Sequence, residues 1–136
     1  MRMRKKKRGD ERLKALSALT VCEPEIYKSP EEYPFLENRP MRLEIGCGKG
    51  DFICGLAARD TEYNYLAIER VLDVCVAALE KYAESRDLGT LDYHGGWRSP
   101  DGTIYKDEAW DIPMEMRGNV RFMPIDASKI DEFFHP

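Results

Sequence analysis

Apolar and polar residues alternate along the chain in patterns that predict strands and helices in turn. In Met41–Ile45, Leu43 and Ile45 lie on either side of an acid, which is the period of a β-strand. Asn64–Ile68 contains a near-continuous apolar run, typical of a parallel strand that is covered on both faces. A third strand is predicted from Asn119 to Pro124.

Helical patterns separate these strands. Asp51–Arg59 carries an apolar stripe at helical spacing, and Val71–Ser85 repeats apolar residues at the same period. A short helical piece is expected after Asp126, through Phe134. Because strands that alternate with helices form right-handed crossovers, we predict an α/β fold with a Rossmann-like, doubly wound parallel sheet.

The residues before the first strand have a different character. A short helix is predicted from Asp10 to Val21, and four prolines then make regular structure improbable up to Pro40. We expect Tyr33, Phe35 and Leu36 to fill a groove on the main body. Residues 1–40 are therefore a basic arm and a proline-rich wrap, and residues 41–136 form the α/β domain.

Residues 90–118 interrupt the step from the second long helix to the third strand. Turn residues recur there, and Pro100-Asp101-Gly102 is typical of a small hairpin. Its aromatic residues are suited to stacking on RNA bases, but the interpretation we favour is that they hold the insertion together or cover the sheet. These residues are Trp97, Tyr105 and Trp110.

Composition and charge narrow the class of protein. The chain has 136 residues with 43% hydrophobic and 34% charged residues, which fits one globular domain. No apolar run approaches the ~20 residues of a membrane span. The four cysteines have no CxxC pairing, so we expect reduced thiols in the cytoplasm, with no metal site or disulfide.

The net charge of −4 conceals an asymmetry. Six positive charges lie in the first eight residues, and the remainder has a net charge of −10. A basic arm on an acidic body is either a phosphate-binding tail or a solvated terminus. The residues that would contact nucleic acid are Arg4, Lys5, Lys6, Lys7 and Arg8.

A glycine-rich turn follows the first strand. Gly46, Gly48 and Gly50 alternate, and this spacing differs from both the G-x-G-x-x-G dinucleotide fingerprint and the phosphate-binding loop. The pattern E-x-G-x-G-x-G, which begins at Glu44, resembles the first motif of class I S-adenosylmethionine (SAM) methyltransferases. The alternative is a strand-to-helix turn without a ligand.

Two further acids follow strands of the predicted sheet. Glu69 ends the second strand, where a nucleoside-binding fold places a carboxylate that accepts hydrogen bonds from both ribose hydroxyls. The alternative is a surface ion pair with Arg70. Asp126 follows the third strand at the same carboxyl edge, where it is suited to accept from the adenine amino group or to cap the next helix.

Several segments together are similar to bacterial tRNA (guanine-N7-)-methyltransferases, a family that methylates guanine in the variable loop of tRNA. The resemblance implies SAM as cofactor, tRNA as partner, no membrane association, and cofactor contacts from Glu44, Glu69, Asp126 and the turn of Gly46, Cys47 and Gly48. It leaves monomer and homodimer equally open. The matching segments are Met1–Lys6, Tyr33–Phe35, Leu43–Ile53, Asn64–Glu69 and Asn119–Phe122.

The sequence departs from this family in the insertion 90–118 and in its end at Pro136. The family's fourth strand and the acid near the guanine are expected after this point. We therefore expect an N-terminal portion with an incomplete sheet, a bare edge on the first strand and no assignable catalytic residue. The alternatives are a class I methyltransferase with another substrate, and a catalytically inactive SAM- or RNA-binding module.

Overall fold

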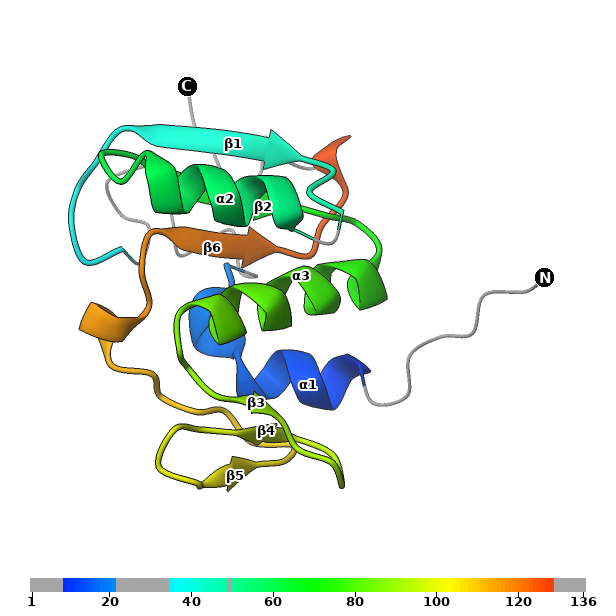
Figure 1. Ribbon diagram of the computed structural model, residues 1–136. Coiled ribbons are helices and arrows are strands. Elements are labelled where there is room, and N and C mark those ends of the chain that lie inside the picture. The colour runs from blue at the N-terminus through cyan, green and yellow to red at the C-terminus, as the bar shows by residue number, and fades with distance from the viewer. Residues whose placement is uncertain (1–8, 22–34, 49, 129–136) are drawn as a thin grey trace.

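The computed structural model describes residues 9–21, 35–48 and 50–128 (Figure 1). Its main sheet has three parallel strands in the order β1-β2-β6. In its register Leu43 lies opposite Leu66, which in turn lies opposite Arg121. The predicted α/β class and parallel sheet are confirmed. The strands are β1 (Met41–Ile45), β2 (Asn64–Ile68) and β6 (Val120–Met123).

Two helices cover one face of this sheet. Figure 1 shows α2 (Asp51–Arg59) and α3 (Leu72–Ser85) on the same side of the strands. A shorter helix, α1 (Gly9–Ala15), packs along α3, where the Arg12 guanidinium forms an ion pair with the Glu80 carboxylate.

The first helix ends earlier than the sequence predicts. A 3-10 turn, η1 (Ser17–Leu19), follows α1, and the chain then runs beside β6. Thr20 forms a parallel bridge with Phe122, and the Val21 amide donates to the Phe122 carbonyl at 2.9 Å. Because these residues must be extended to pair with the edge of β6, they cannot continue the helix to Val21.

The strands β2 and β6 are buried on both faces. Tyr65 and Phe122 lie in the cluster beneath the helices, whereas Leu66 and Met123 lie in a smaller cluster on the opposite face. Every residue of both strands is buried. This agrees with the near-continuous apolar pattern of a covered parallel strand.

The strand β1 is less covered. Leu43 is 43% exposed and Ile45 is 60% exposed, although both occupy the face on which Leu66 and Ile68 are buried. Within the described residues, no strand pairs with the outer edge of β1. The expected bare edge is therefore present in the described part of the chain.

The insertion forms a second, antiparallel sheet. Its strands are β3 (Thr90–Leu91), β4 (Trp97–Arg98) and β5 (Ile104–Tyr105), and the 3-10 turn η4 (Met114–Met116) leads from it to β6. The hairpin predicted at Pro100-Asp101-Gly102 joins β4 to β5. Asp101 accepts from the Ser99 hydroxyl and the Thr103 amide, and these hydrogen bonds, that of Ser99 first, lower the pKa of Asp101 to about 2.

The aromatic residues of the insertion are structural, as the favoured interpretation holds. Trp97 is buried, and its indole N–H donates to the Leu88 carbonyl at 2.8 Å. The rings of Tyr105 and Trp110 stack with centroids 5.7 Å apart. Backbone contact with α1 completes the attachment, because the Trp110 amide donates to the Ala15 carbonyl at 3.0 Å.

The proline-rich wrap is described only in part. Phe35 packs against the smaller cluster, and the Arg121 guanidinium lies 4.8 Å from its ring centroid. Leu36, however, is 59% exposed, so the prediction that it fills a groove is wrong. Tyr33 lies outside the described residues.

Candidate functional site

A left-handed turn connects β1 to α2. Gly46, Gly48 and Gly50 have φ angles of +71°, +56° and +85°, which side chains with a Cβ adopt only with strain. The amides of Gly46 and Cys47 both donate to the Ile68 carbonyl, at 2.8 and 3.1 Å. The turn is therefore fixed to the carboxyl end of β2.

The three glycines differ in what surrounds them. A Cβ added to Gly46 or Gly48 would meet no atom within 4 Å, so these positions border open space. A Cβ added to Gly50 would lie 2.9 Å from the Ala78 Cβ. Gly50 therefore permits close packing of the turn on α3, whereas Gly46 and Gly48 leave main chain accessible to a ligand.

Glu69 joins this turn to the beginning of α3. One carboxylate oxygen accepts from the Gly48 amide at 3.2 Å, and the other accepts from the Val71 amide at 3.0 Å. No ion pair between Glu69 and Arg70 is present in the described structure. The carboxylate is thus oriented by two main-chain donors, one in the glycine turn and one at the beginning of α3.

Three of the predicted site residues line one cavity. Gly46, Glu69 and Asp126 border a hollow of about 210 Å³ at the carboxyl ends of the strands. Asp126 also accepts from the Ser128 amide at 3.0 Å, the contact that a helix-capping aspartate makes. The sequence had not indicated the other residues of the lining, which are Ile45, Ile68, Arg70, Ile125 and Ala127.

Glu44 lies outside that lining. Its position opposite Ala67 places it toward the helices, because Ala67 belongs to the cluster beneath them. It nevertheless influences the turn. Burial raises the pKa of the Cys47 thiol to about 12, and the nearby charges of Glu69 and Glu44 add to this effect. Cys47 is thus a neutral thiol beside two carboxylates.

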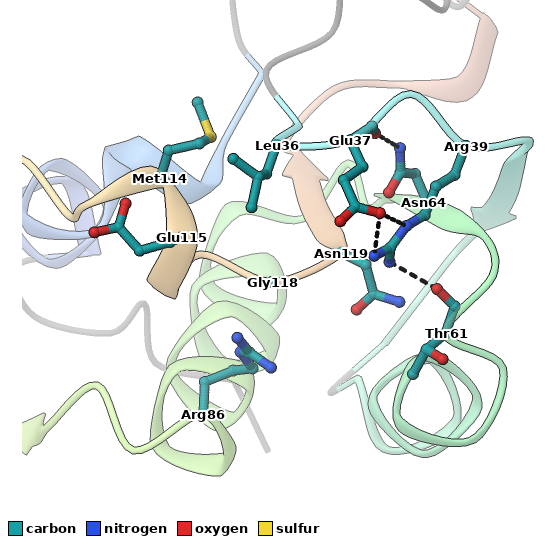
Figure 2. Close-up of a pocket in the computed structure, with 10 residues that line it drawn as sticks. All are labelled: Leu36, Glu37, Arg39, Thr61, Asn64, Arg86, Met114, Glu115, Gly118 and Asn119. Carbon is teal, nitrogen blue, oxygen red and sulfur yellow. Dashed lines mark hydrogen bonds and ion pairs between the residues drawn. The ribbon is translucent and has the colours of Figure 1, made fainter.

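A second cavity lies at the opposite edge of the sheet. This hollow has a volume of about 230 Å³. Figure 2 shows its lining, which comes from the residues that lead into the strands, from η4 and from Arg86. Its polar side chains form hydrogen bonds with backbone carbonyls and with each other. The Arg39 guanidinium donates to the Thr61 carbonyl at 2.7 Å and to the Glu37 carboxylate at 2.8 Å.

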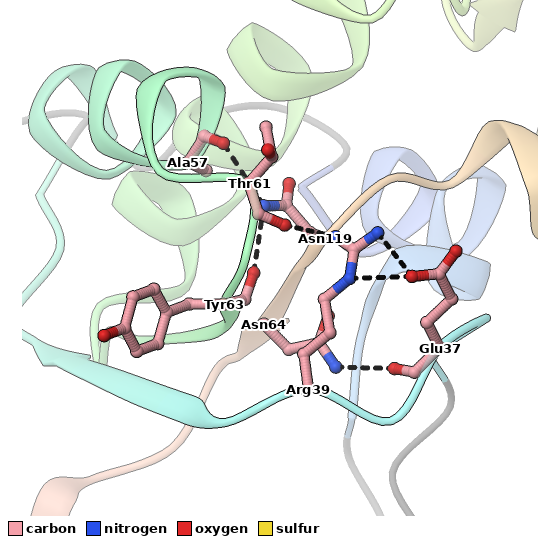
Figure 3. Close-up of polar contacts among 7 residues, drawn as sticks. All are labelled: Glu37, Arg39, Ala57, Thr61, Tyr63, Asn64 and Asn119. Carbon is pink, nitrogen blue, oxygen red and sulfur yellow. Dashed lines mark hydrogen bonds and ion pairs between the residues drawn. The ribbon is translucent and has the colours of Figure 1, made fainter.

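The two asparagines at this edge act in the same way (Figure 3). The Asn64 amide donates to the Glu37 carbonyl at 2.8 Å, and the Asn119 amide donates to the carbonyls of Ala57 and Tyr63. These contacts hold together the loops that enter the strands. Because ligands of open parallel sheets bind at the carboxyl ends, we assign this cavity a structural role.

The predicted RNA contacts of the basic arm are untested by the geometry. The basic residues Arg4–Arg8 lie outside the described residues, so their contact with RNA stays a prediction. Within the described ranges, no helix has the length and apolar character that a membrane span requires.

Comparison with known proteins identifies the class of this chain. The model of a family described as "Putative methyltransferase" matches residues 38–136. A protein of Listeria monocytogenes serotype 4a (strain HCC23) is 39% identical over 85 residues, covering 62% of this chain and 40% of that protein. A protein of Lactococcus lactis subsp. cremoris (strain SK11) is 31% identical over 134 residues, covering 98% of this chain and 48% of that protein.

Both relatives are named tRNA (guanine-N(7)-)-methyltransferase, as is a protein of Bacillus licheniformis that is 36% identical over 85 residues, covering 62% of this chain and 40% of that protein. The chain spans less than half the length of these relatives. The family match begins just before β1 and includes the glycine turn, Glu69 and Asp126. Because that match covers most of its length, the chain belongs to this methyltransferase family.

Proposed function

We propose that this chain supplies the SAM-binding part of an enzyme that methylates N7 of guanine in the variable loop of tRNA. The observation that carries the proposal is the position of Glu69, which lines the cavity with Gly46 and Asp126 while bonded to Gly48. The names of the relatives support tRNA as the substrate. Such a reaction places the protein in the cytoplasm.

The hydrogen-bonding capacity of Glu69 fits a nucleoside. An ionised carboxylate offers about four lone-pair sites. The amides of Gly48 and Val71 occupy one site on each oxygen. One further site on each oxygen is then left to accept from a ribose hydroxyl, and the main-chain donors hold the carboxylate in place before the ligand arrives.

The other residues have complementary roles in this proposal. The bare backbone of Gly46 and Gly48 admits the cofactor, and Asp126 accepts from its adenine amino group while keeping its contact with Ser128. Cys47 lines the turn as a neutral group. Glu44, on the helix-covered face of β1 just before the turn, provides negative charge for the cationic part of SAM.

The chemistry requires positioning more than acid–base catalysis. SAM supplies an electrophilic methyl group, and the product is S-adenosylhomocysteine. Guanine N7 carries an in-plane lone pair in the neutral base, so its attack on carbon needs no general base. The residues of this chain orient the donor by hydrogen bonding, and none of them is assigned to the transfer itself.

The test measures cofactor binding and methyl transfer separately. Equilibrium dialysis with labelled SAM gives the affinity of the full chain, and transfer of labelled methyl to unmodified tRNA gives its activity. Glu69→Ala should weaken SAM binding at least ~10-fold, because hydrogen bonds to a charged group contribute about 1.5–3 kcal/mol each. Glu62→Ala is the matched control, since Glu62 is an exposed acid in the loop before β2.

The outcomes distinguish the alternatives. Equal SAM affinity of Glu69→Ala and the unaltered chain would refute the cofactor assignment. SAM binding without transfer to any tRNA would indicate an inactive SAM-binding module. Transfer to a small molecule or a protein, with tRNA unmodified, would indicate a class I methyltransferase with another substrate.

A further inference from the structure

The turn between β3 and β4 presents two aromatic rings to solvent. Tyr93 is 96% exposed, and its ring meets the ring of the exposed His94 edge to face, with centroids 5.3 Å apart. Small polar residues and glycine ordinarily occupy such turns. A tyrosine that is 96% exposed there departs from local sequence rules while burying almost none of its surface, and such departures mark functional positions.

The turn holds these rings on a fixed frame. The Asp92 carboxylate accepts from the Arg98 guanidinium at 2.6 Å and from the His94 amide at 3.1 Å. Arg98 lowers the pKa of Asp92, so this carboxylate stays ionised at neutral pH. Buried Trp97 anchors the adjoining strand. The backbone that carries Tyr93 is therefore ordered before a ligand binds.

A hollow separates this turn from α1. About 370 Å³ in volume, it is lined by Tyr93, His94 and Arg12 together with Leu91, Asp92, Gly95 and Gly96. The charges beside it are compensated within the protein, because Arg12 pairs with Glu80 and Asp92 pairs with Arg98. The surface therefore suits a flat, uncharged group better than a phosphate or a metal ion.

This hollow and the glycine turn lie on opposite sides of α3. Glu80 of α3 contacts Arg12, whereas Ala78 of α3 faces Gly50 and Lys81 pairs with Asp51 at the beginning of α2. Both α1 and α3 therefore lie between the β3–β4 turn and the glycine turn (Figure 1). In Figure 1 the β3–β4 turn, the start of α1 and the carboxyl ends of the strands face the same side.

We propose that Tyr93 is a stacking platform for an unpaired base of the RNA substrate. This inference rests on the proposed function, because it takes the RNA to be the one methylated at the candidate site. Proteins recognise unpaired RNA bases by stacking them on aromatic side chains. Two rings form too small a surface for a stable protein interface of ~800 Å² per partner, whereas stacking of a base needs a single ring.

The basic arm complements this platform. Six cations precede Gly9, and chain length alone keeps them within roughly 25 Å of the start of α1. Phosphate contacts from the arm and base stacking on Tyr93 are therefore compatible with one bound strand. In this proposal the arm supplies the phosphate contacts, and Tyr93 supplies a contact that requires no basic residue on the acidic body.

The test is tRNA affinity of the full chain at several salt concentrations, measured by filter binding. Tyr93→Ala should raise the Kd at least ~5-fold, since stacking contributes about that factor or more per base. Tyr93→Phe, which keeps the ring, should bind like the unaltered chain. Ile104→Ala is the control, because Ile104 is a half-exposed residue on β5 away from the turn.

The salt dependence identifies the mode of binding. Stacking neutralises no phosphate and so releases no counterions on binding. Tyr93→Ala should therefore leave the slope of log Kd against log salt unchanged. Deletion of residues 2–8 should reduce that slope. Unchanged tRNA affinity in Tyr93→Ala overturns the stacking proposal.

SAM binding, measured in parallel, separates the two proposals. If the unaltered chain binds SAM and tRNA but Tyr93→Ala has no effect, only the stacking proposal fails. If the unaltered chain binds no tRNA, the stacking proposal and the proposed substrate fail together.

Discussion

Substitution of single glycines in the turn after β1 should separate stability from ligand binding. Gly50→Ala places a Cβ 2.9 Å from the Ala78 Cβ, whereas Gly46→Ala places one in open space. Both residues have positive φ angles, +85° and +71°. The two substitutions therefore share a backbone cost and differ in packing.

The expected magnitudes follow from these two terms. A left-handed conformation costs a residue with a Cβ roughly 1–2 kcal/mol. Overpacking in a close-packed site adds about 1–3 kcal/mol. Gly50→Ala should thus lower the free energy of unfolding by about 2–5 kcal/mol, and Gly46→Ala by about 1–2 kcal/mol.

Urea unfolding followed by circular dichroism measures both values. A double variant, Gly50→Ala with Ala78→Gly, isolates the packing term, because removing the Ala78 Cβ relieves the close contact. Ala78→Gly alone should cost about 1 kcal/mol, since glycine is unfavourable within a helix. The coupling between the two substitutions should be stabilising by about 1–3 kcal/mol.

Ligand binding should show the reverse order. A methyl group at Gly46 enters the space that the cofactor would occupy, so Gly46→Ala should raise the Kd for SAM by about 5-fold or more. Gly50→Ala, once folded, should bind SAM with nearly unchanged affinity. Equal losses of stability for the two substitutions, with no coupling to Ala78, would refute this division of roles.

Three other predictions concern the core, the thiols and the sheet edge. Trp97→Ala should destabilise the chain by about 3–5 kcal/mol in urea unfolding, because it empties a buried site. Trp97→Phe should cost less, although it leaves the Leu88 carbonyl without its indole donor. A loss below about 1 kcal/mol for both variants would contradict the anchoring role of Trp97. Burial raises the pKa values of Cys47 and Cys54 to about 12 and about 11, so both thiols should resist iodoacetamide at pH 8 in peptide-resolved mass spectrometry. Because the folded state holds these protons more tightly than the unfolded state, stability should fall as pH rises from ~9 toward those values. Rapid labelling of the folded protein would argue against the burial of the two thiols. Leu43→Lys should reduce any self-association detected by analytical ultracentrifugation with little change in thermal midpoint, because it charges a 43% exposed position on a strand whose outer edge is unpaired within the described residues. A large loss of stability would show that the position is covered in solution.

The site could be predicted in outline because its parts follow strands. Parallel strands bring their carboxyl ends to one edge, so Gly46, Glu69 and Asp126 were expected together, and the cavity contains all three. The face of the sheet on which Glu44 lies could not be predicted in this way. Alternation along β1 directs it toward the helices, and only the register with Ala67 shows which face that is.

Long-range contacts changed other expectations. The helix predicted to reach Val21 ends at Ala15, because the chain must extend to pair with Phe122, about 100 residues away. Leu36 is apolar but exposed, since the sequence does not specify which surface lies beneath it.

The sequence by itself determined the order of strands and helices, the glycine turn and the acids at the strand ends, because periodicity and spacing are local properties of the backbone. The tertiary structure decided which glycine packs and which borders open space, because that depends on Ala78, in another helix. It also decided that Glu69 accepts from two separate amides and that Tyr93 projects into solvent. Gly48 is 21 residues from Glu69 and Ala78 is 28 residues from Gly50, so only packing brings these pairs together.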